Sequence, residues 1–205
     1  MMSQEQKSTS QTKHTADRIG AVSAFLLDRD SLLPVVASRL GGDERFESTI
    51  RGGSMAPAIP QYSRLQVQLL GGRVPERGDI LYYLADDGFV IHRVVQHLSA
   101  DSGERYFLTI GDDCLAPDPP LPEHRILGVV IAVETSSGRC APGPPQSRSA
   151  FHRLARAVSI PATVAASRIS LSAGARVAML FRQLENAGRA RVGRMLRFVG
   201  LLRDR

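Results

Sequence analysis

Ser54 lies in a glycine-rich segment that could present a nucleophile to a substrate. Residues 51–57 read Arg-Gly-Gly-Ser-Met-Ala-Pro. Glycines let the backbone turn sharply and approach a substrate closely, and a serine hydroxyl beside a general base can attack a carbonyl carbon. The backbone N–H groups of such a turn could also meet the oxyanion that this attack produces. Taken alone, Gly-Gly-Ser is more typical of an ordinary turn.

The base beside Ser54 would be a histidine or a lysine, and position nearly excludes lysine. Only two of the 26 basic residues are lysines, Lys7 and Lys13, and both precede the first predicted strand. Among the five histidines, His92 lies in the strongly β-like run 89–95. Alternation along a strand puts His92 on one face with two valines, so a core histidine with satisfied hydrogen bonds is the alternative interpretation.

A carboxylate that fixes the tautomer of the histidine would complete a Ser-His-Asp arrangement. Residues 111–118, Gly-Asp-Asp-Cys-Leu-Ala-Pro-Asp, contain three candidates, Asp112, Asp113 and Asp118. Aspartates in loops commonly cap turns, so the residue types alone leave the choice among the three open.

Five short segments, taken in order, resemble the type I signal peptidase family. They are Gly-x-Ser-Met-x-Pro at 52–57, Arg-Gly-Asp-Ile at 77–80, Ile-His-Arg-Val-Val at 91–95, Thr-Ile-Gly-Asp-Asp at 109–113 and Leu-Gly-Val-Val at 127–130. One branch of this family uses a Ser/Lys pair, whereas the endoplasmic-reticulum and archaeal branch has His in place of Lys. The chain is similar to the second branch over about residues 46–133.

The resemblance implies roles for three residues. The nucleophile of the family falls on Ser54 and its general base on His92. Its third residue follows the first Asp of the Gly-Asp segment by six positions, which favours Asp118 over Asp112 and Asp113 as the partner of His92.

Further residues of the matched segments are expected to support this site. Asp112 and Gly53 are supporting residues in this interpretation, and Met55 is expected to shape the substrate cleft together with Pro57. Gly52 departs from the family, which often has a serine there whose hydroxyl helps to bind the oxyanion. Because loss of one oxyanion donor costs about 10²–10³ in rate, a slow enzyme is expected.

The function predicted from these residues is a serine endopeptidase that cleaves a peptide or precursor protein, as in signal peptide processing, with no metal or cofactor. An alternative is a non-catalytic or regulatory relative that binds peptide or a membrane surface through its basic tail. A third interpretation, a LexA-like self-cleaving repressor, is disfavoured because it requires the missing lysine and a longer DNA-binding domain.

The predicted fold is mainly β: a signal-peptidase/LexA-like domain with short helices before it and a basic helical extension after it. Short alternating runs separated by Gly, Pro and Asp predict strands. These runs are 45–50, 65–69, 80–84, 89–95, 106–110 and 126–133.

Composition predicts five regions along the chain. They are a disordered N-terminus (1–14), two short helices (15–44), the peptidase domain (45–134), a Gly/Pro-rich linker (135–149) and an Arg-rich helical tail (150–205) that Pro161 interrupts. From residue 141 onward twelve arginines face two acids, a net charge of +10 within a total of +6. Such a tail could meet anionic lipid or an acidic partner, while its few aromatic residues make nucleic acid an unlikely ligand.

Location and thiol chemistry follow from absences in the sequence. Its first residues lack the apolar core of a secretory signal, and the longest uncharged run of the tail, 157–167, is far shorter than the about 20 residues of a spanning helix. A cytoplasmic protein with a peripheral membrane contact is therefore expected. Cys114 and Cys140 form no C-x-x-C pair, so they are expected to be free thiols.

Overall fold

The computed structural model describes residues 44–86, 88–135, 138–144 and 149–198, with the backbone alone for 191–198. The expected disordered segment 1–14 and nearly all of the expected helical segment 15–44 lie outside the described residues.

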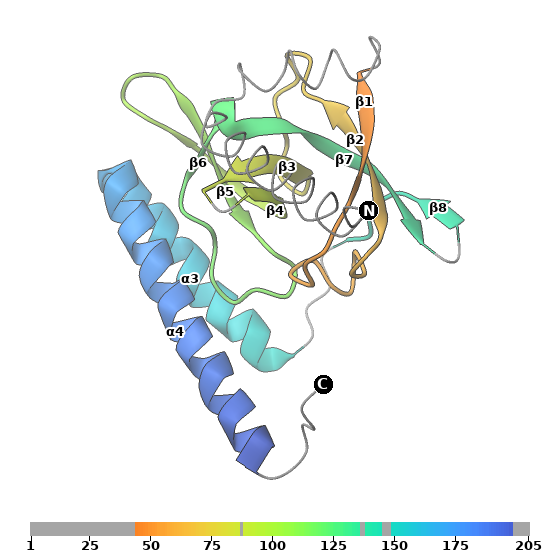
Figure 1. Cartoon of the computed structure of the whole chain (residues 1–205). Helices are drawn as coiled ribbons and strands as arrows, with labels where there is room; N and C mark the ends of the chain where they lie inside the picture. Colours follow the sequence, from red (N-terminus) through yellow and green to blue (C-terminus); the bar gives the residue numbers. More distant parts are fainter. Residues whose placement is uncertain (1–43, 87, 136–137, 145–148, 199–205) are drawn as a thin grey trace, which may run out of the picture.

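In the described part of the chain, eight antiparallel strands form one sheet, in the order β1-β2-β7-β3-β4-β5-β6 with β8 paired to β7 (Figure 1). Register shifts between β2 and β7, β3 and β7, and β4 and β5 allow the sheet to bend. The strands are β1 (Arg45–Thr49), β2 (Arg64–Leu69), β3 (Ile80–Ala85), β4 (Gly88–Ser99), β5 (Arg105–Ile110), β6 (Leu121–Pro122), β7 (Ile126–Thr135) and β8 (Gly138–Cys140), with a short 3₁₀ turn η1 (Glu123–Arg125) before β7.

The mainly β prediction is confirmed, and all six predicted runs form strands. Alternation was a reliable signal because each strand buries one face: in β2, Leu65 and Val67 are fully buried. Strand β8 was not predicted, since it lies inside the segment expected to be a linker. Its residues are exposed, so they carry no apolar alternation that would have predicted a strand.

Two apolar clusters fill the core of the sheet. One joins the segment after Ser54 to the middle strands, and the other lies under β3, β5 and β7. The first contains Met55, Ile59, Leu65, Val67, Ile80, Ile91, Val130 and Val133. The second contains Leu70, Leu81, Tyr83, Val94, Phe107, Leu121, Ile126 and Val129.

The tail is helical, as predicted, and its described residues form two helices, α3 (Ala150–Ile169) and α4 (Leu171–Phe198). Ser149 caps the first and Ser170 the second through their hydroxyl oxygens. Pro161 does not interrupt α3, so that expectation was wrong. Pro161 and Ala157, whose carbonyl loses its helical partner, both lie on the exposed side, where water can satisfy the freed oxygen.

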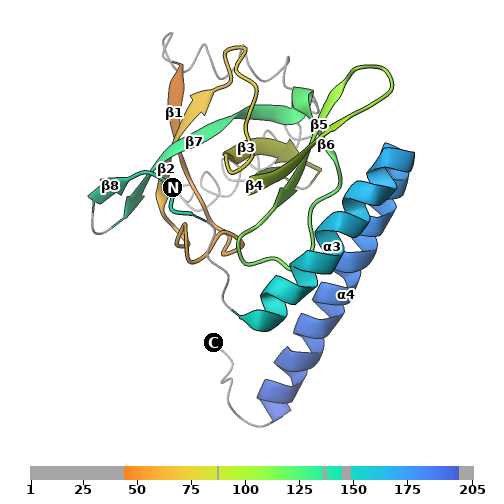
Figure 2. The same cartoon turned by 180° about the vertical axis from the view of Figure 1, so that it is seen from behind.

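Small side chains form the interface between α3 and α4. Three residues of α3 at intervals of four are buried: Ser159, Thr163 and Ser167. Ala178 of α4 is buried as well. A Cβ added at Gly174 would overlap the side chain of Ser167, so only glycine permits this close approach. The helix pair lies beside the segment that joins β5 to β6 (Figure 2). Among the described residues, no helix combines the length and the apolar content that crossing a bilayer requires.

Candidate active site

Ser54, His92 and Asp118 lie in one hydrogen-bonded row. His92 Nε2 is 3.0 Å from Ser54 Oγ, and His92 Nδ1 is 2.6 Å from Asp118 Oδ2. When Nδ1–H donates to the carboxylate, the lone pair of Nε2 faces the serine hydroxyl and can accept its proton. His92 is buried with both ring nitrogens bonded, and what sets it apart from an ordinary core histidine is that its partners are a serine hydroxyl and a carboxylate.

Three elements far apart in the sequence carry these side chains. Ser54 lies in the turn between β1 and β2, His92 lies in β4 opposite Leu81 of β3, and Asp118 lies in the segment between β5 and β6. The backbone N–H of Asp118 donates to the carbonyl of Thr109, which fixes the far end of that segment against β5. A sheet therefore holds His92, and two loops hold Ser54 and Asp118.

Gly111 makes room for the serine and the histidine to meet. A Cβ added at Gly111 would lie 2.8 Å from His92 Nε2, 2.8 Å from the Ser54 carbonyl oxygen and 2.8 Å from the Cys114 sulfur. Any larger residue would have to displace one of these atoms. The glycine of the Gly-Asp segment is thus explained by space around the base.

Asp118 is buried among hydrogen-bond donors. Its Oδ2 accepts from His92, from the Thr109 hydroxyl at 2.7 Å and from the Tyr83 hydroxyl at 3.1 Å. Burial alone would raise the pKa of Asp118, but the charge and hydrogen bond of His92, the charge of Arg182 and the hydrogen bond of Thr109 together lower it. Asp118 is therefore a carboxylate at neutral pH.

Asp112 does not contact the row but forms a buried ion pair with Arg93. The guanidinium donates to both carboxylate oxygens, at 3.0 and 2.8 Å, and also to the carbonyls of Gly78 and Gly143 at 2.9 Å each. Because Arg93 follows His92 in β4, this pair ties the start of the carboxylate loop to the strand of the base. Asp112 supports the site from a distance.

Met55 does not shape a cleft, so this expectation was wrong. Its side chain is fully buried in the first apolar cluster, because the residue after the nucleophile turns inward. Pro57 is exposed and lines neither of the cavities that flank Ser54. Gly53 is exposed, and its carbonyl accepts a hydrogen bond from the N–H of Ala56, which closes the turn.

Ser54 lies between two cavities. The larger, of about 540 Å³, extends past His92 and Asp118 toward three charged side chains, Asp86, Arg125 and Arg182. The smaller, of about 200 Å³, is lined mostly by apolar side chains, among them Ile50, Leu65, Phe89 and Ile91. A chain crossing Ser54 would thus meet charged side chains only on the side of the larger cavity, while apolar side chains line both.

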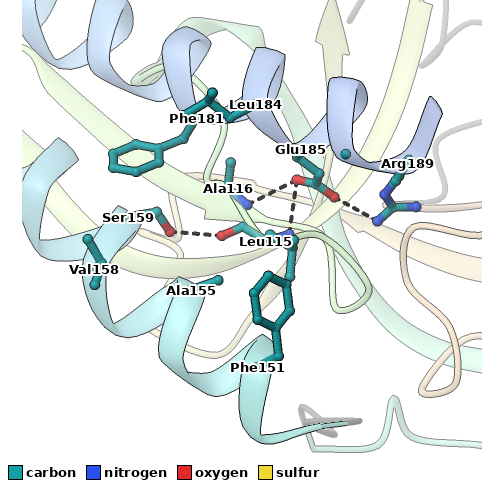
Figure 3. Close-up of a pocket in the computed structure, with 11 residues that line it drawn as sticks. Leu115, Ala116, Phe151, Ala155, Val158, Ser159, Phe181, Leu184, Glu185 and Arg189 are labelled. Carbon is teal, nitrogen blue, oxygen red and sulfur yellow. Dashed lines mark hydrogen bonds and ion pairs between the residues drawn. The ribbon is translucent and has the colours of Figure 1, made fainter. Parts of the chain in front are cut away.

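The two C-terminal helices hold the backbone of the carboxylate loop. Glu185 of α4 accepts from the N–H groups of Leu115 and Ala116, at 3.0 and 3.1 Å, while Ser159 of α3 donates to the Leu115 carbonyl at 2.8 Å (Figure 3). Arg189 in turn pairs with Glu185. The loop that ends at Asp118 is thereby bonded to both helices.

Arg156 of α3 holds the beginning of the same loop. Its guanidinium donates to three carbonyl oxygens, those of Gly111, Asp112 and Cys114. Three carbonyls directed at one side chain form a rigid attachment, since each bond fixes a different peptide unit. The basic tail therefore packs onto the candidate site. Some of its arginines bind the carboxylate loop and are not free to meet another partner.

Sequence reasoning missed Tyr83, Thr109 and Arg182, which all bond to Asp118. Thr109 was within a matched segment, so a search for hydroxyls near the expected triad could have found it. Tyr83 lies on the strand that pairs with the strand of His92, and no local pattern identifies it. Arg182 could not be found, because only the fold brings α4 beside the loop.

The free thiol beside the site is a poor rival to Ser54 as nucleophile. Cys114 and Cys140 are both free, as predicted. Burial, together with the nearby Glu185 carboxylate, raises the pKa of Cys114 to about 11. The reactive thiolate is therefore scarce at neutral pH.

No protein-family model matches the chain, and no curated protein matches it in sequence. Among the described residues, no group of three or more His, Cys, Asp or Glu side chains is arranged to hold a metal ion.

Proposed function

We propose that the protein is a serine endopeptidase of the signal-peptidase type, with the fold of that family and its LexA-like relatives. The observation that carries this proposal is the row Ser54–His92–Asp118, with 3.0 and 2.6 Å between successive members. The order of the five matched segments supports the family assignment.

The row can perform acyl transfer with residues of the chain alone. Ser54 Oγ attacks the scissile carbonyl carbon while His92 Nε2 takes the hydroxyl proton, which yields a tetrahedral oxyanion. Collapse expels the amine, to which His92 returns the proton, and leaves an ester on Ser54. Water, deprotonated by His92, then attacks this ester and releases the acid product and the free serine.

Backbone N–H groups must stabilise the oxyanion, because Gly52 offers no hydroxyl. The N–H groups of Gly53 and Ser54 make no hydrogen bond to another backbone group among the described residues, which leaves them open to a ligand. The turn around Gly52 also has open space, with no heavy atom within 4 Å of an added Cβ. With one donor fewer than its relatives, the enzyme would be slow.

The two cavities suggest which substrates fit. A peptide chain lying across Ser54 would place an apolar side chain in the smaller cavity, beside Ile50 and Phe89. In the larger cavity it would face Arg125 and Arg182. Peptides with an apolar residue on one side of the scissile bond are the substrates to test first.

The test is cleavage of a mixture of synthetic peptides, followed by mass spectrometry. Wild type should cut a subset with an apolar residue near the bond, and Ser54→Ala should cut none of them. The matched control is Ser102→Ala, in an exposed turn away from the site, which should behave as wild type. Equal product from wild type and Ser54→Ala would refute the proposal.

A second function, attachment to an anionic membrane surface, is favoured by the surface of helices α3 and α4, where large apolar side chains are exposed. Of ten large apolar side chains exposed among the described residues, seven lie on α3 and α4, whereas the buried contact between the helices uses small residues. Packing through small residues with large apolar ones outward is typical of helices in contact with lipid. The exposed members are Phe151, Leu154, Val158, Ile169, Met179, Leu180 and Leu184.

Under this second proposal the enzyme is cytoplasmic and its helices touch the inner face of a membrane. Vesicles containing anionic lipid should co-sediment the protein, and neutral vesicles should bind it less, because α3 and α4 are rich in arginine. Phe151→Ser combined with Leu154→Ser should abolish co-sedimentation. Deletion of the two helices is a poor test, since it would also remove Arg156 and Glu185, which hold the loop that ends at Asp118. Undiminished binding of the double variant would exclude this surface.

A further inference from the structure

We propose that Arg182 is a positioning residue for the catalytic carboxylate, so that helix α4 supplies a fourth member of the peptidase site. This inference rests on the proposed function of the Ser54–His92–Asp118 row. It assigns to the helical extension a role that none of the matched sequence segments contains.

The two oxygens of Asp118 have different partners. Oδ2 receives His92, Thr109 and Tyr83, whereas Oδ1 is 2.9 Å from Arg182 Nη1. The terminal torsion of an aspartate has a broad energy minimum, so a carboxylate held at one oxygen alone can rotate. Arg182 fixes the second oxygen and with it the plane of the carboxylate.

Arg182 itself is held in place by the helix that carries it. Glu185, one turn further along α4, accepts hydrogen bonds from the N–H groups of Leu115 and Ala116, three and two residues before Asp118. Residues three apart on a helix share a face, so the ion pair and the backbone bonds act on the same loop from the same side. The arginine therefore approaches Asp118 from a helix that is already attached to the loop.

Arg182 is much more exposed to solvent than Asp118, the residue with which it pairs. The arginine side chain is 42% exposed and lines the larger cavity beside Ser54, whereas the Asp118 side chain is only 7% exposed. Two roles are therefore distinguishable for Arg182: it could hold Asp118, or it could bind substrate in the cavity. Loss of positioning lowers kcat, whereas loss of substrate binding raises KM.

The experiment compares Arg182→Gln and Arg182→Lys with wild type on a peptide that wild type cleaves. We expect Arg182→Gln to lower kcat by about tenfold to 10²-fold, the range for a small misplacement of a catalytic group, with KM within about twofold. Arg182→Lys keeps a cation near Oδ1 and should recover part of kcat. Arg176→Gln removes one exposed arginine from the same helix and should leave both constants unchanged.

A second measurement does not depend on activity. In ¹H NMR, the Nδ1–H proton shared between His92 and Asp118 should give a far-downfield signal in wild type. That signal should shift or broaden in Arg182→Gln, and not in Arg176→Gln. Thermal unfolding of each variant shows that it is folded.

The outcomes separate the two proposals. A wild-type kcat in Arg182→Gln, or a raised KM with unchanged kcat, would overturn the positioning role and leave the peptidase intact. If wild type cleaves no peptide, the proposed function fails, and an unchanged Nδ1–H signal in Arg182→Gln then also rejects the positioning role. A changed signal with a lowered kcat and rescue by lysine supports it.

Discussion

The backbone N–H of Asp113 donates to the carbonyl oxygen of Ser54 over 2.7 Å. This bond joins the turn that carries Ser54 to the loop that ends at Asp118. Because Arg156 and Glu185 hold that loop from the helices, the position of Ser54 depends on contacts made far beyond it in the sequence.

Gly111→Ala should abolish activity while leaving a folded protein. The added Cβ would lie 2.8 Å from His92 Nε2 and from the Ser54 carbonyl, so the base and the nucleophile are pushed apart. Overpacking of this kind costs about 1–3 kcal/mol, which a domain of ordinary stability tolerates. Peptide cleavage together with thermal unfolding measures both effects.

Gly103→Ala, in an exposed turn with φ +83°, is a matched control that is strained but distant from the site. Cleavage at the wild-type rate in Gly111→Ala would contradict this account.

Asp118→Asn should lower kcat by about 10⁴-fold with little change in KM, because an amide cannot hold the same tautomer of His92. Single-turnover cleavage of a peptide measures the loss. Asp113→Asn changes a neighbouring carboxylate that pairs with Arg189, and this variant should lose far less activity. If the two variants lost activity equally, Asp118 would not be the partner of the base.

Thr109→Val should shift the acid sensitivity of folding to higher pH. The pKa of Asp118 is lowered in the folded protein, so its stabilising effect is complete above the unfolded pKa of about 3.9 and is lost as pH falls through the folded pKa. Removing the 2.7 Å hydrogen bond from Thr109 raises that folded pKa. Stability at neutral pH should fall by about 1.5–3 kcal/mol, and the difference from wild type should shrink in acid.

Urea unfolding between neutral and acid pH tests this prediction. Thr49→Val, on the exposed side of β1, provides the matched control and should change little. A difference between Thr109→Val and wild type that stays constant across the whole pH range would show that Thr109 does not act through Asp118.

Asp112→Ala should reduce stability more than catalysis. It leaves the guanidinium of Arg93, which is buried, without its carboxylate, and breaking such a pair costs about 3–5 kcal/mol. The folded fraction should still cleave peptide within a few-fold of wild type, because Asp112 does not contact the triad. Glu123→Ala removes a solvent-screened pair with the exposed Arg105 and should change stability far less than Asp112→Ala does. Chemical unfolding and single-turnover rates together decide. A loss of rate like that of Asp118→Asn would place Asp112 in the catalytic machinery instead.

The sequence predicted the strands well because their signal is local. Apolar and polar residues alternate strictly along strand β2, and the apolar residues Leu65 and Val67 lie in the core. The proximity of Ser54, His92 and Asp118 could be anticipated only through ordered segments resembling a known family, since spacing alone left three aspartates open. Distance along the chain carried no information about which of them meets the base.

The features that were missed depend on tertiary contacts. Pro161 was expected to break a helix, but its face of α3 is open to solvent, and this could not be known before the helix was oriented. Met55 was expected to shape the cleft because it belongs to a segment that resembles the family, yet the turn directs it into the core. Arg182 pairs with Asp118 across the fold from helix α4, a contact that no spacing in the sequence indicates.

The place of Arg182 in the chain has a consequence during synthesis. A ribosome produces Ser54, His92 and Asp118 before the helix that fixes the second oxygen of the carboxylate, because synthesis runs from the N-terminus. A nascent chain would thus hold nucleophile and base before their orientation is complete. Under the proposed positioning role, proteolytic activity would rise by about tenfold to 10²-fold once α4 has emerged and docked, which would limit premature cleavage of the unfinished chain.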